Sequence, residues 1–350
     1  MKKHLYIPIF LITLLFGLQN VEAGNGDRVG EAGSLDLLIN PWARSSGFHS
    51  LNTASVWGLE AMRLNVGGLA FVDQTEIAFS STRWLEGSDI TISSFGFAQH
   101  VGESGVFGVN VMSMSFGDLI RTTVDQPDGG DGSTFSPRYT NIGLAYSKSF
   151  SESIHGGILV RLVNQSIADV SAGGIAFDTG IQYVTGPNDN VKFGISLRNV
   201  GTPMQYSGDG LNVAYEATTG ATINGEQRPA AFELPTLLNI GGAYDFYIGD
   251  RHRITAVANF TSNSFRGDFI GAGLEYAFNE MFMLRGGFKY EDGMFEEEIA
   301  LGSSALNGFA GGLSVNVPFK EDGPQIGIDY SYRTTTVFNG VHSFSVKINL

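Results

Sequence analysis

The sequence predicts an all-β fold: a transmembrane antiparallel β-barrel of about 14 strands with an N-terminal plug segment. Three observations predict this fold class. Apolar and polar residues alternate along most of the chain, the alternating segments are long enough to cross a bilayer, and the connections between them alternate between short and long. Glycine supplies 47 of the 350 residues and aromatic residues supply 12%, which is typical of strands joined by turns.

The alternation is plainest in the segment 340–350, where Phe344, Val346 and Ile348 interleave with Ser345 and Lys347. Successive side chains of a strand point to opposite faces, so we expect Val346 and Ile348 to face lipid and Lys347 to face the lumen. A soluble sandwich would show the same alternation. Segments of about 10 residues, with aromatic residues toward the ends of their apolar faces, favour a membrane barrel.

The alternating segments define the predicted strands. They are 74–84, 89–101, 105–121, 139–150, 152–166, 171–185, 190–200, 235–248, 251–262, 268–278, 281–291, 307–319, 324–334 and 340–350. An even number of strands is usual for bacterial single-chain barrels. We therefore assign residues 74–350 to the barrel.

The first residues have the three parts of a secretory signal. Lys2 and Lys3 are followed by an apolar run from Leu5 to Leu18, and a cut after Ala23 is expected. About 14 apolar residues are short for a membrane-spanning helix, which needs roughly 20. Residues 1–23 are therefore assigned to a signal peptide, and no later segment is apolar enough for a transmembrane helix.

Residues 24–73 do not alternate and are too apolar for a solvated tail. Irregular backbone at membrane depth must be enclosed by protein or water. This segment is expected to lie inside the barrel as a plug.

The predicted connections fall into two classes. Short ones include 102–104, 186–189 and 279–280, and the long ones are 122–138, 201–234 and 292–306. Outer-membrane barrels have short periplasmic turns and longer outer loops. We therefore expect a multi-pass protein of the cell outer membrane, in contact with its lipid, with both barrel termini on the periplasmic side. The long loops are the candidate binding surfaces.

Composition excludes several classes of function. A net charge of −14 disfavours nucleic acid as a partner, because its phosphates require clustered Lys and Arg. The absence of cysteine excludes disulfides, thiolate metal sites, a cysteine nucleophile and a lipid-modified N-terminal cysteine.

The acidic clusters in the loops are candidate metal sites. Asp125, Asp128 and Asp131 lie among glycines, and Glu296 to Glu298 follow a strand. Carboxylates suit calcium, but the spacing matches no EF-hand, and solvated acidic loops explain them equally well.

Histidines and glycine pairs also fail to define a site. His100, His155 and His252 lie beside short turns, and His342 next to Ser343 has no acidic partner identifiable from the sequence. Glycine pairs such as Gly286–Gly287 lack the strand–loop–helix setting of a phosphate site, and in strands they permit bends and close approach. The sequence thus names no catalytic, cofactor-binding or metal-binding residue. We expect no cofactor and no enzymatic activity.

Several motifs resemble those of a known family. They are 38–47 (Leu-Ile-Asn-Pro-Trp-Ala-Arg-Ser-Ser-Gly), 64–70 (Leu-Asn-Val-Gly-Gly-Leu-Ala), 193–201, and Leu234-Pro235-Thr236 with Gly241 and Tyr244. In this order they are similar to the PorV/PorQ family, a branch of the FadL-type barrels. Leu64, Val66 and Gly67 depart from the family's Trp, Pro and Ala.

The resemblance implies a role in type IX secretion, with translocon subunits or secreted cargo proteins as partners. PorV-type members receive cargo, and PorQ-type members belong to the attachment complex. The rival hypothesis is a FadL-type channel for hydrophobic small molecules, with residues 24–73 as its gate. The third hypothesis is a surface adhesin or scaffold.

Overall fold

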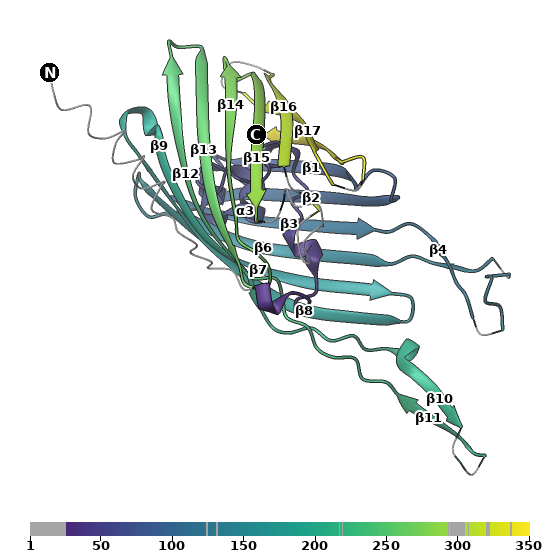
Figure 1. Ribbon diagram of the computed structural model, residues 1–350. Coiled ribbons are helices and arrows are strands. Elements are labelled where there is room, and N and C mark those ends of the chain that lie inside the picture. The colour runs from purple at the N-terminus through teal and green to yellow at the C-terminus, as the bar shows by residue number, and fades with distance from the viewer. Residues whose placement is uncertain are drawn as a thin grey trace.

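The computed structural model describes residues 26–350, apart from 124, 131, 217, 219, 293, 295–304, 307, 320–322 and 337. The predicted signal peptide lies outside the described residues. Fourteen strands close into one antiparallel barrel in the order β1-β18-β17-β16-β15-β14-β13-β12-β9-β8-β7-β6-β3-β2 (Figure 1). The fold class predicted from the alternation is confirmed.

The barrel strands, with their bounds, are β1 (Thr75–Trp84), β2 (Ile90–Val101), β3 (Gly105–Ser115), β6 (Arg138–Ser149), β7 (Ile154–Ile167), β8 (Val170–Thr185), β9 (Val191–Gly201), β12 (Leu237–Ile248), β13 (His252–Asn263), β14 (Phe269–Phe278), β15 (Phe282–Glu291), β16 (Gly308–Pro318), β17 (Gln325–Arg333) and β18 (Val341–Asn349). Each predicted strand matches one of these to within a few residues, with one exception.

The exception is the predicted strand 105–121, which ends at Ser115. Gly117 has a φ of 76°, a left-handed conformation that interrupts an extended strand. Beyond it the chain forms a small hairpin of β4 (Leu119–Ile120) and β5 (Thr134–Phe135). A second hairpin, β10 (Asn212–Glu216) with β11 (Thr222–Glu226), lies within the predicted loop 201–234. Both project beyond the barrel (Figure 1).

The connections sort the barrel into two ends. Residues 116–137, 202–236 and 292–307 connect strands at what we call the long-loop end, and the connections 102–104, 249–251 and 279–281 lie at the short-turn end. Each strand runs from one end to the other, as antiparallel order requires. The sorting predicted from loop lengths is therefore present in the fold.

The two faces of the wall differ in polarity as the alternation predicts. In β18, Phe344 is 44% exposed on the outer face, whereas Lys347 is 5% exposed and faces the lumen. Lumen-facing Glu275, Arg285 and Asp329 are likewise buried. An apolar outer wall around a polar interior is the pattern of a barrel that spans lipid. Among the described residues, no helix is long and apolar enough to cross a membrane.

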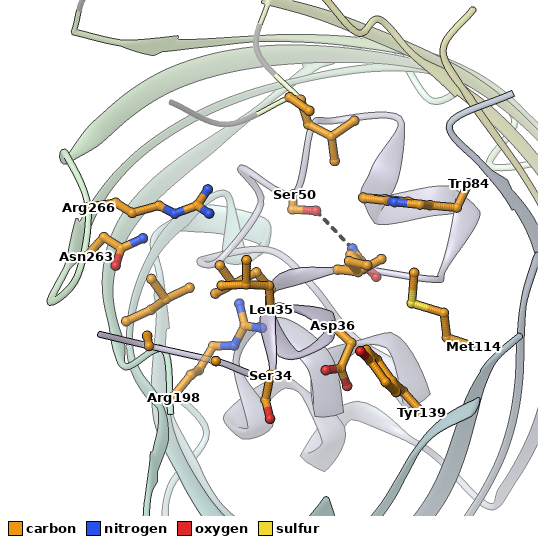
Figure 2. A pocket seen from close by; sticks show the side chains of 18 of the residues that line it. Ser34, Leu35, Asp36, Ser50, Trp84, Met114, Tyr139, Arg198, Asn263 and Arg266 are labelled. Carbon is orange, nitrogen blue, oxygen red and sulfur yellow. Dashed lines mark hydrogen bonds between the residues drawn. The ribbon is translucent and has the colours of Figure 1, made fainter. Parts of the chain in front are cut away.

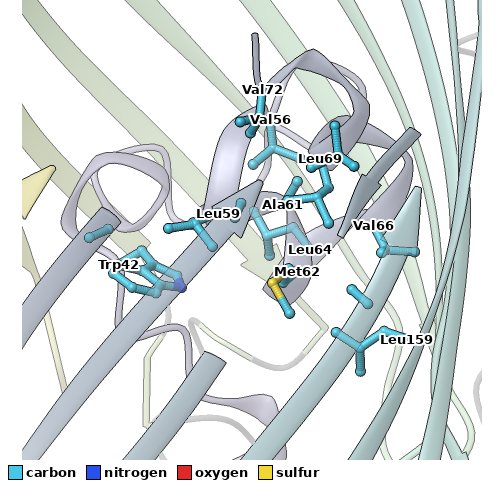
Figure 3. Close-up of a cluster of buried hydrophobic side chains, with 14 residues drawn as sticks. Trp42, Val56, Leu59, Ala61, Met62, Leu64, Val66, Leu69, Val72 and Leu159 are labelled. Carbon is cyan, nitrogen blue, oxygen red and sulfur yellow. The ribbon is translucent and has the colours of Figure 1, made fainter. Parts of the chain in front are cut away.

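Residues before β1 form short helices, most of which pack inside the barrel. They are η1 (Gly26–Arg28), η2 (Leu35–Leu38), α2 (Ala43–Ser46), η3 (Gly58–Glu60), α3 (Ala61–Leu64) and η4 (Val66–Phe71). We call residues 34–72 the plug. Its apolar side chains, including Trp42, Leu59 and Leu69, share a core with small wall residues such as Ala98 and Ala145 (Figure 3).

Glycines on the lumen face of the wall make room for the plug. A Cβ atom on Gly96 would lie 3.1 Å from the Leu59 side chain, and one on Gly108 would lie 2.9 Å from Leu69. A Cβ on Gly194 would meet the plug backbone at Ala54, 2.7 Å away. These positions exclude larger residues because the plug already occupies the space. The close approach considered for the strand glycines is thus their role at these positions.

Polar side chains of the wall hold the plug backbone. Gln182 in β8 donates to the Val56 carbonyl at 2.7 Å, and Ser196 in β9 donates to the Leu64 carbonyl at 2.7 Å. At the seam between β1 and β18, Thr82 donates to the Pro41 carbonyl at 3.2 Å, and Ser345 accepts from the Ala43 amide at 2.9 Å. These bonds satisfy irregular backbone that is shut away from water.

Candidate functional site

A cavity of about 760 Å³ opens into the lumen at the long-loop end. We call it the long-loop cavity. Much of its lining is apolar or aromatic and comes from the plug, the wall and the connections 116–137 and 202–236: Leu35, Leu38, Trp84, Phe116, Tyr206 and Phe232. Several of its side chains converge on this space in Figure 2. Its volume is in the range of small-molecule sites, which are mostly apolar with a few placed polar groups.

Loop 202–236 helps to build this cavity. Met204 and Leu234, at its two ends, are buried in a cluster that includes Leu37 of the plug. Tyr206 donates to the side-chain oxygen of Gln165 in β7 at 2.7 Å. Burial raises the pKa of Tyr206 to about 12, so its hydroxyl remains a neutral donor. The base of this loop is therefore ordered against the barrel, so this candidate binding surface is partly buried at its two ends.

Three cationic side chains line the deep part of the long-loop cavity. Arg198 in β9, Lys289 in β15 and Arg333 in β17 are each less than 10% exposed. Arg333 donates to the Asn40 carbonyl at 3.2 Å and Arg198 to the Leu37 carbonyl at 3.4 Å. Lys289 lies 4.6 Å from the ring centroid of Phe269.

Donors remain available in this cationic region. Among the described residues, the Nε atoms of Arg198 and Arg333 and the Nε2 atom of His49 have no hydrogen-bond partner. All three side chains line the cavity. Leaving a buried charged donor unpaired is costly, so an anionic or strongly polar ligand group would be stabilised here.

A second cavity, of about 480 Å³, lies on the other side of the plug at the short-turn end. We call it the short-turn cavity. Its lining is more strongly charged and includes an ion-pair network between strands. Glu275 in β14 contacts Arg285 in β15 at 2.8 Å and Arg253 in β13 at 3.2 Å. Lys192 contacts Asp245 at 2.6 Å. The lumen thus presents at one end a largely apolar cavity that contains three buried cations and the buried carboxylates Asp36 and Glu291, and at the other end a mixed-charge cavity.

The histidines weighed from the sequence do not assemble a catalytic site. His342 lies on the outer face, where its ring contacts the Tyr330 hydroxyl at 2.8 Å and Glu86 at 3.0 Å. Ser343 points the opposite way, into the lumen, and bonds with Thr82 at 2.8 Å. Glu86 is the acidic partner that the sequence could not identify, but the serine lies on the other face of the strand.

The acidic loops give no further site in the described residues. Asp125 and Asp128 are exposed. Asp131, Glu296, Glu297 and Glu298 lie outside the described residues, as does most of the predicted binding loop 292–306. Within the part of the chain that the structure describes, no three acidic or histidine side chains gather in a way that could hold a metal ion.

The sequence predicted none of the cavity residues as a site. Lys289 lies in the predicted strand 281–291, and Arg198 lies in the segment 193–201 that carries the family resemblance. The available signal was the position of three cationic residues on the inward face near the long-loop ends of β9, β15 and β17. Their convergence depends on strand order and on the plug, which the sequence alone did not supply.

No protein-family model matches the sequence, and no curated protein matches it. Solved structures do match the fold. They include the CymD monoaromatic hydrocarbon channel (TM-score 0.54, 12% identity, 89% of this chain and 96% of CymD). The toluene transporter TbuX of Ralstonia pickettii gives a TM-score of 0.53 at 13% identity, over 89% of this chain and 97% of TbuX. The toluene transporter TodX of Pseudomonas putida gives 0.51 at 14%, over 85% and 93%.

At these identities the likeness concerns the fold. It agrees with the closed barrel of 14 strands and its apolar outer wall. A wall of this kind is stable only in lipid, and closed antiparallel barrels are the spanning structures of outer membranes. The protein is therefore a multi-pass outer-membrane barrel with the FadL-type fold.

Proposed function

We propose that this protein is an outer-membrane channel for hydrophobic small molecules that carry an anionic or strongly polar group. The observation that carries the proposal is the long-loop cavity, where apolar side chains surround buried cationic donors with unused hydrogen-bonding capacity. The apolar body of a ligand would fill the space near Trp84, Phe116 and Phe232, and its polar group would meet Arg198, Lys289 and Arg333. The proposal involves no covalent step.

The structural comparisons support the channel hypothesis more than the secretion hypothesis. The matched structures are described as a monoaromatic hydrocarbon channel and as toluene transporters. Those ligands are neutral, whereas this cavity contains three buried cations. We therefore extend the proposal from hydrophobic to amphipathic molecules on the basis of this chain's own residues.

The test is binding of dodecanoate and dodecanol to the purified protein in lipid nanodiscs. We expect dodecanoate to bind more tightly than dodecanol, because a charge-assisted hydrogen bond adds about 1.5 kcal/mol or more, roughly a tenfold change in affinity. Arg333→Met should weaken dodecanoate binding by about that factor and leave dodecanol binding nearly unchanged. Arg251→Met, at an exposed position of the short-turn end, is the matched control.

Two results would contradict this proposal. Equal affinity for the acid and the alcohol would show that the cations do not recognise the polar group. The absence of binding of either molecule to the wild-type protein would remove the ligand-binding function altogether.

A PorV/PorQ-type secretion role is the second candidate. Besides the motif resemblance, the β10–β11 hairpin supports it. Val213, Tyr215 and Ile223 share one face of this hairpin by register and are all exposed. Apolar side chains on a projecting hairpin are suited to protein–protein contact.

Deleting residues 212–226 separates the two candidates. A secretion protein would lose cargo export or attachment while its barrel still inserts, because the hairpin makes no pairing with the barrel sheet. A channel would keep dodecanoate uptake and leave protein secretion unaffected.

A further inference from the structure

One short turn of the plug separates the two lumen cavities. His49 and Ser50 line the long-loop cavity, whereas Phe48 and Asn52 line the short-turn cavity. We call residues 47–51 the crossing turn. Neighbouring residues of this turn therefore face different compartments, and the partition here is only one turn of backbone thick.

The plug on both sides of the crossing turn is bonded to the wall. Before it, Asp36 accepts from Asn141 and Gln165, each at 2.9 Å. After it, Gln182 donates to Val56 at 2.7 Å and Glu76 accepts from the Leu59 amide at 3.1 Å. These anchors come from β1, β6, β7 and β8, so they fix the plug around much of the barrel.

The crossing turn differs from its flanks in its contact with the wall. Among the described residues, no hydrogen bond joins residues 47–51 to a barrel strand. Their hydrogen bonds run within the plug, as from the Ser50 amide to the Ser45 carbonyl at 2.9 Å and from Asn40 to the Ser50 hydroxyl at 3.0 Å. Displacing this turn would therefore cost no bond to the barrel.

The wall beside the crossing turn is lined by glycine. A Cβ atom on Gly271 would lie 2.6 Å from the Leu51 side chain, and one on Gly273 would lie 3.0 Å from the Phe48 ring. A Cβ on Gly287 would lie 2.6 Å from the Phe48 carbonyl carbon. Phe48 and Leu51 thus rest on the backbone of β14 and β15 at these glycines. They also share a small apolar cluster with Ala243 of β12 and Val257 of β13.

The backbone of the crossing turn is in a conformation that its residues disfavour. His49 and Ser50 have φ values of 59° and 63°. Two consecutive non-glycine residues in the left-handed region are uncommon, and such positions concentrate at functional and switching segments. The wall behind the turn is continuous: the register between β13 and β17 shows no shift over the described pairs.

We infer that ligand crosses the lumen by displacement of the crossing turn along this glycine strip, while the rest of the plug stays bonded to the wall. The inference rests on the channel function proposed above. On this route, the ligand leaves the lumen through the short-turn cavity. Its lining of Lys192, Arg253 and Glu275 binds an apolar body less well than the long-loop cavity does, so it favours release.

Paired cysteine substitutions test this inference, and the chain has no native cysteine to interfere. Leu51→Cys with Gly271→Cys would tie the crossing turn to β14. Leu59→Cys with Gly96→Cys would tie an anchored part of the plug to β2 and is the matched control, because it also joins a plug leucine to a wall glycine in close contact. Uptake of radiolabelled dodecanoate is measured in cells that produce each variant, with and without dithiothreitol.

The Leu51 crosslink should lower dodecanoate uptake at least about tenfold, with recovery on reduction, and the Leu59 crosslink should leave uptake at the wild-type level. Normal uptake with the Leu51 crosslink would overturn the inference, because the route would avoid this turn. Equal loss with both crosslinks would also overturn it, because the whole plug would have to move.

Two further measurements keep the outcome interpretable. Phe48→Cys with Gly273→Cys ties the same turn through a different contact and replaces the first pair if that variant does not fold. Dodecanoate binding to the purified wild-type protein is measured in parallel. If dodecanoate binds the wild-type protein but neither crosslink of the crossing turn changes uptake, only the crossing route is contradicted. If dodecanoate does not bind, the proposed function is contradicted.

Discussion

The ammonium group of Lys347 in β18 lies 3.8 Å from the ring centroid of Trp57 in the plug. The guanidinium group of Arg44 lies 4.5 Å from the same ring. One aromatic ring of the plug therefore contacts a cation of the wall and a cation of the plug itself. Cation–π pairs contribute about 0.5–1 kcal/mol when exposed and about 2 kcal/mol when desolvated.

Replacing this ring should weaken the joint between plug and wall. Trp57→Leu removes both cation–π contacts and is expected to lower the free energy of unfolding by about 1–4 kcal/mol. Urea unfolding in lipid vesicles measures the change. Trp57→Phe keeps an aromatic face and should lose less. If both variants lose the same amount, the contribution of Trp57 is packing and not cation–π contact.

The ion-pair network should depend strongly on Glu275. Glu275→Gln removes the nearer carboxylate partner of Arg285, whose side chain is fully buried and whose other carboxylate neighbour, Asp329, lies 4.0 Å away. Breaking a buried pair in this way costs about 3–5 kcal/mol. Glu280→Gln is the control, since Glu280 pairs with Arg253 from an exposed position and should change stability by about 1 kcal/mol or less. Similar unfolding midpoints for the two variants would show that the buried pair contributes no more than the exposed one.

Two adjacent glycines of β15 should tolerate substitution very differently. A Cβ on Gly287 would meet the plug backbone, whereas the nearest atom to a Cβ on Gly286 is 3.6 Å away, an ordinary contact. Gly287→Ala is expected to cost about 1–3 kcal/mol through overpacking, and Gly286→Ala about zero. The stability of both variants is measured by the heat-induced change in the electrophoretic mobility of the folded barrel. Equal tolerance would mean that the plug does not approach β15 as closely as described.

The outer face can be tested at Val346, which pairs with Phe79 of β1. An Arg on the lipid face near the bilayer midplane costs roughly 2–4 kcal/mol, so Val346→Arg should impair folding into bilayers. Val346→Ala removes similar contacts without adding charge and should be much milder. Efficient insertion of the Arg variant would place this face toward water, because a one-residue shift of register exchanges the two faces.

Much of the barrel could be predicted from the sequence because lipid and lumen impose a period of two on every strand. That constraint is local, so it placed Lys347 inward and gave the strand bounds within a few residues. It failed where a local break was hidden in an apolar run, as at Gly117 after β3. It also missed the β10–β11 hairpin, which lies within the predicted loop 201–234 and has Gly220 in the connection between its two strands.

The cavity could not be predicted in the same way. Arg198 and Arg333 are 135 positions apart in numbering and meet one space only because the strands close into a ring and the plug leaves that space free. Arg63 illustrates the same difficulty within the plug, where it donates to the Ile39 carbonyl at 2.7 Å. Such contacts join irregular segments, for which the sequence has no periodic signal. The family motifs resemble those of a secretion family, whereas the matched structures bear on the fold alone.

The seam between β1 and β18 has a consequence for how the barrel assembles. Thr82 and Ser343 pair across it although 261 residues separate them, so the ring cannot close before nearly the whole barrel segment has been delivered to the membrane. Residues 41–43 bond to both sides of that seam through Thr82 and Ser345. A plug that is in place as the edges meet can bond to both of them and act as a template that brings two distant strand edges into the correct alignment. Pairing between such distant segments is intrinsically slow, and a preassembled plug would shorten the search.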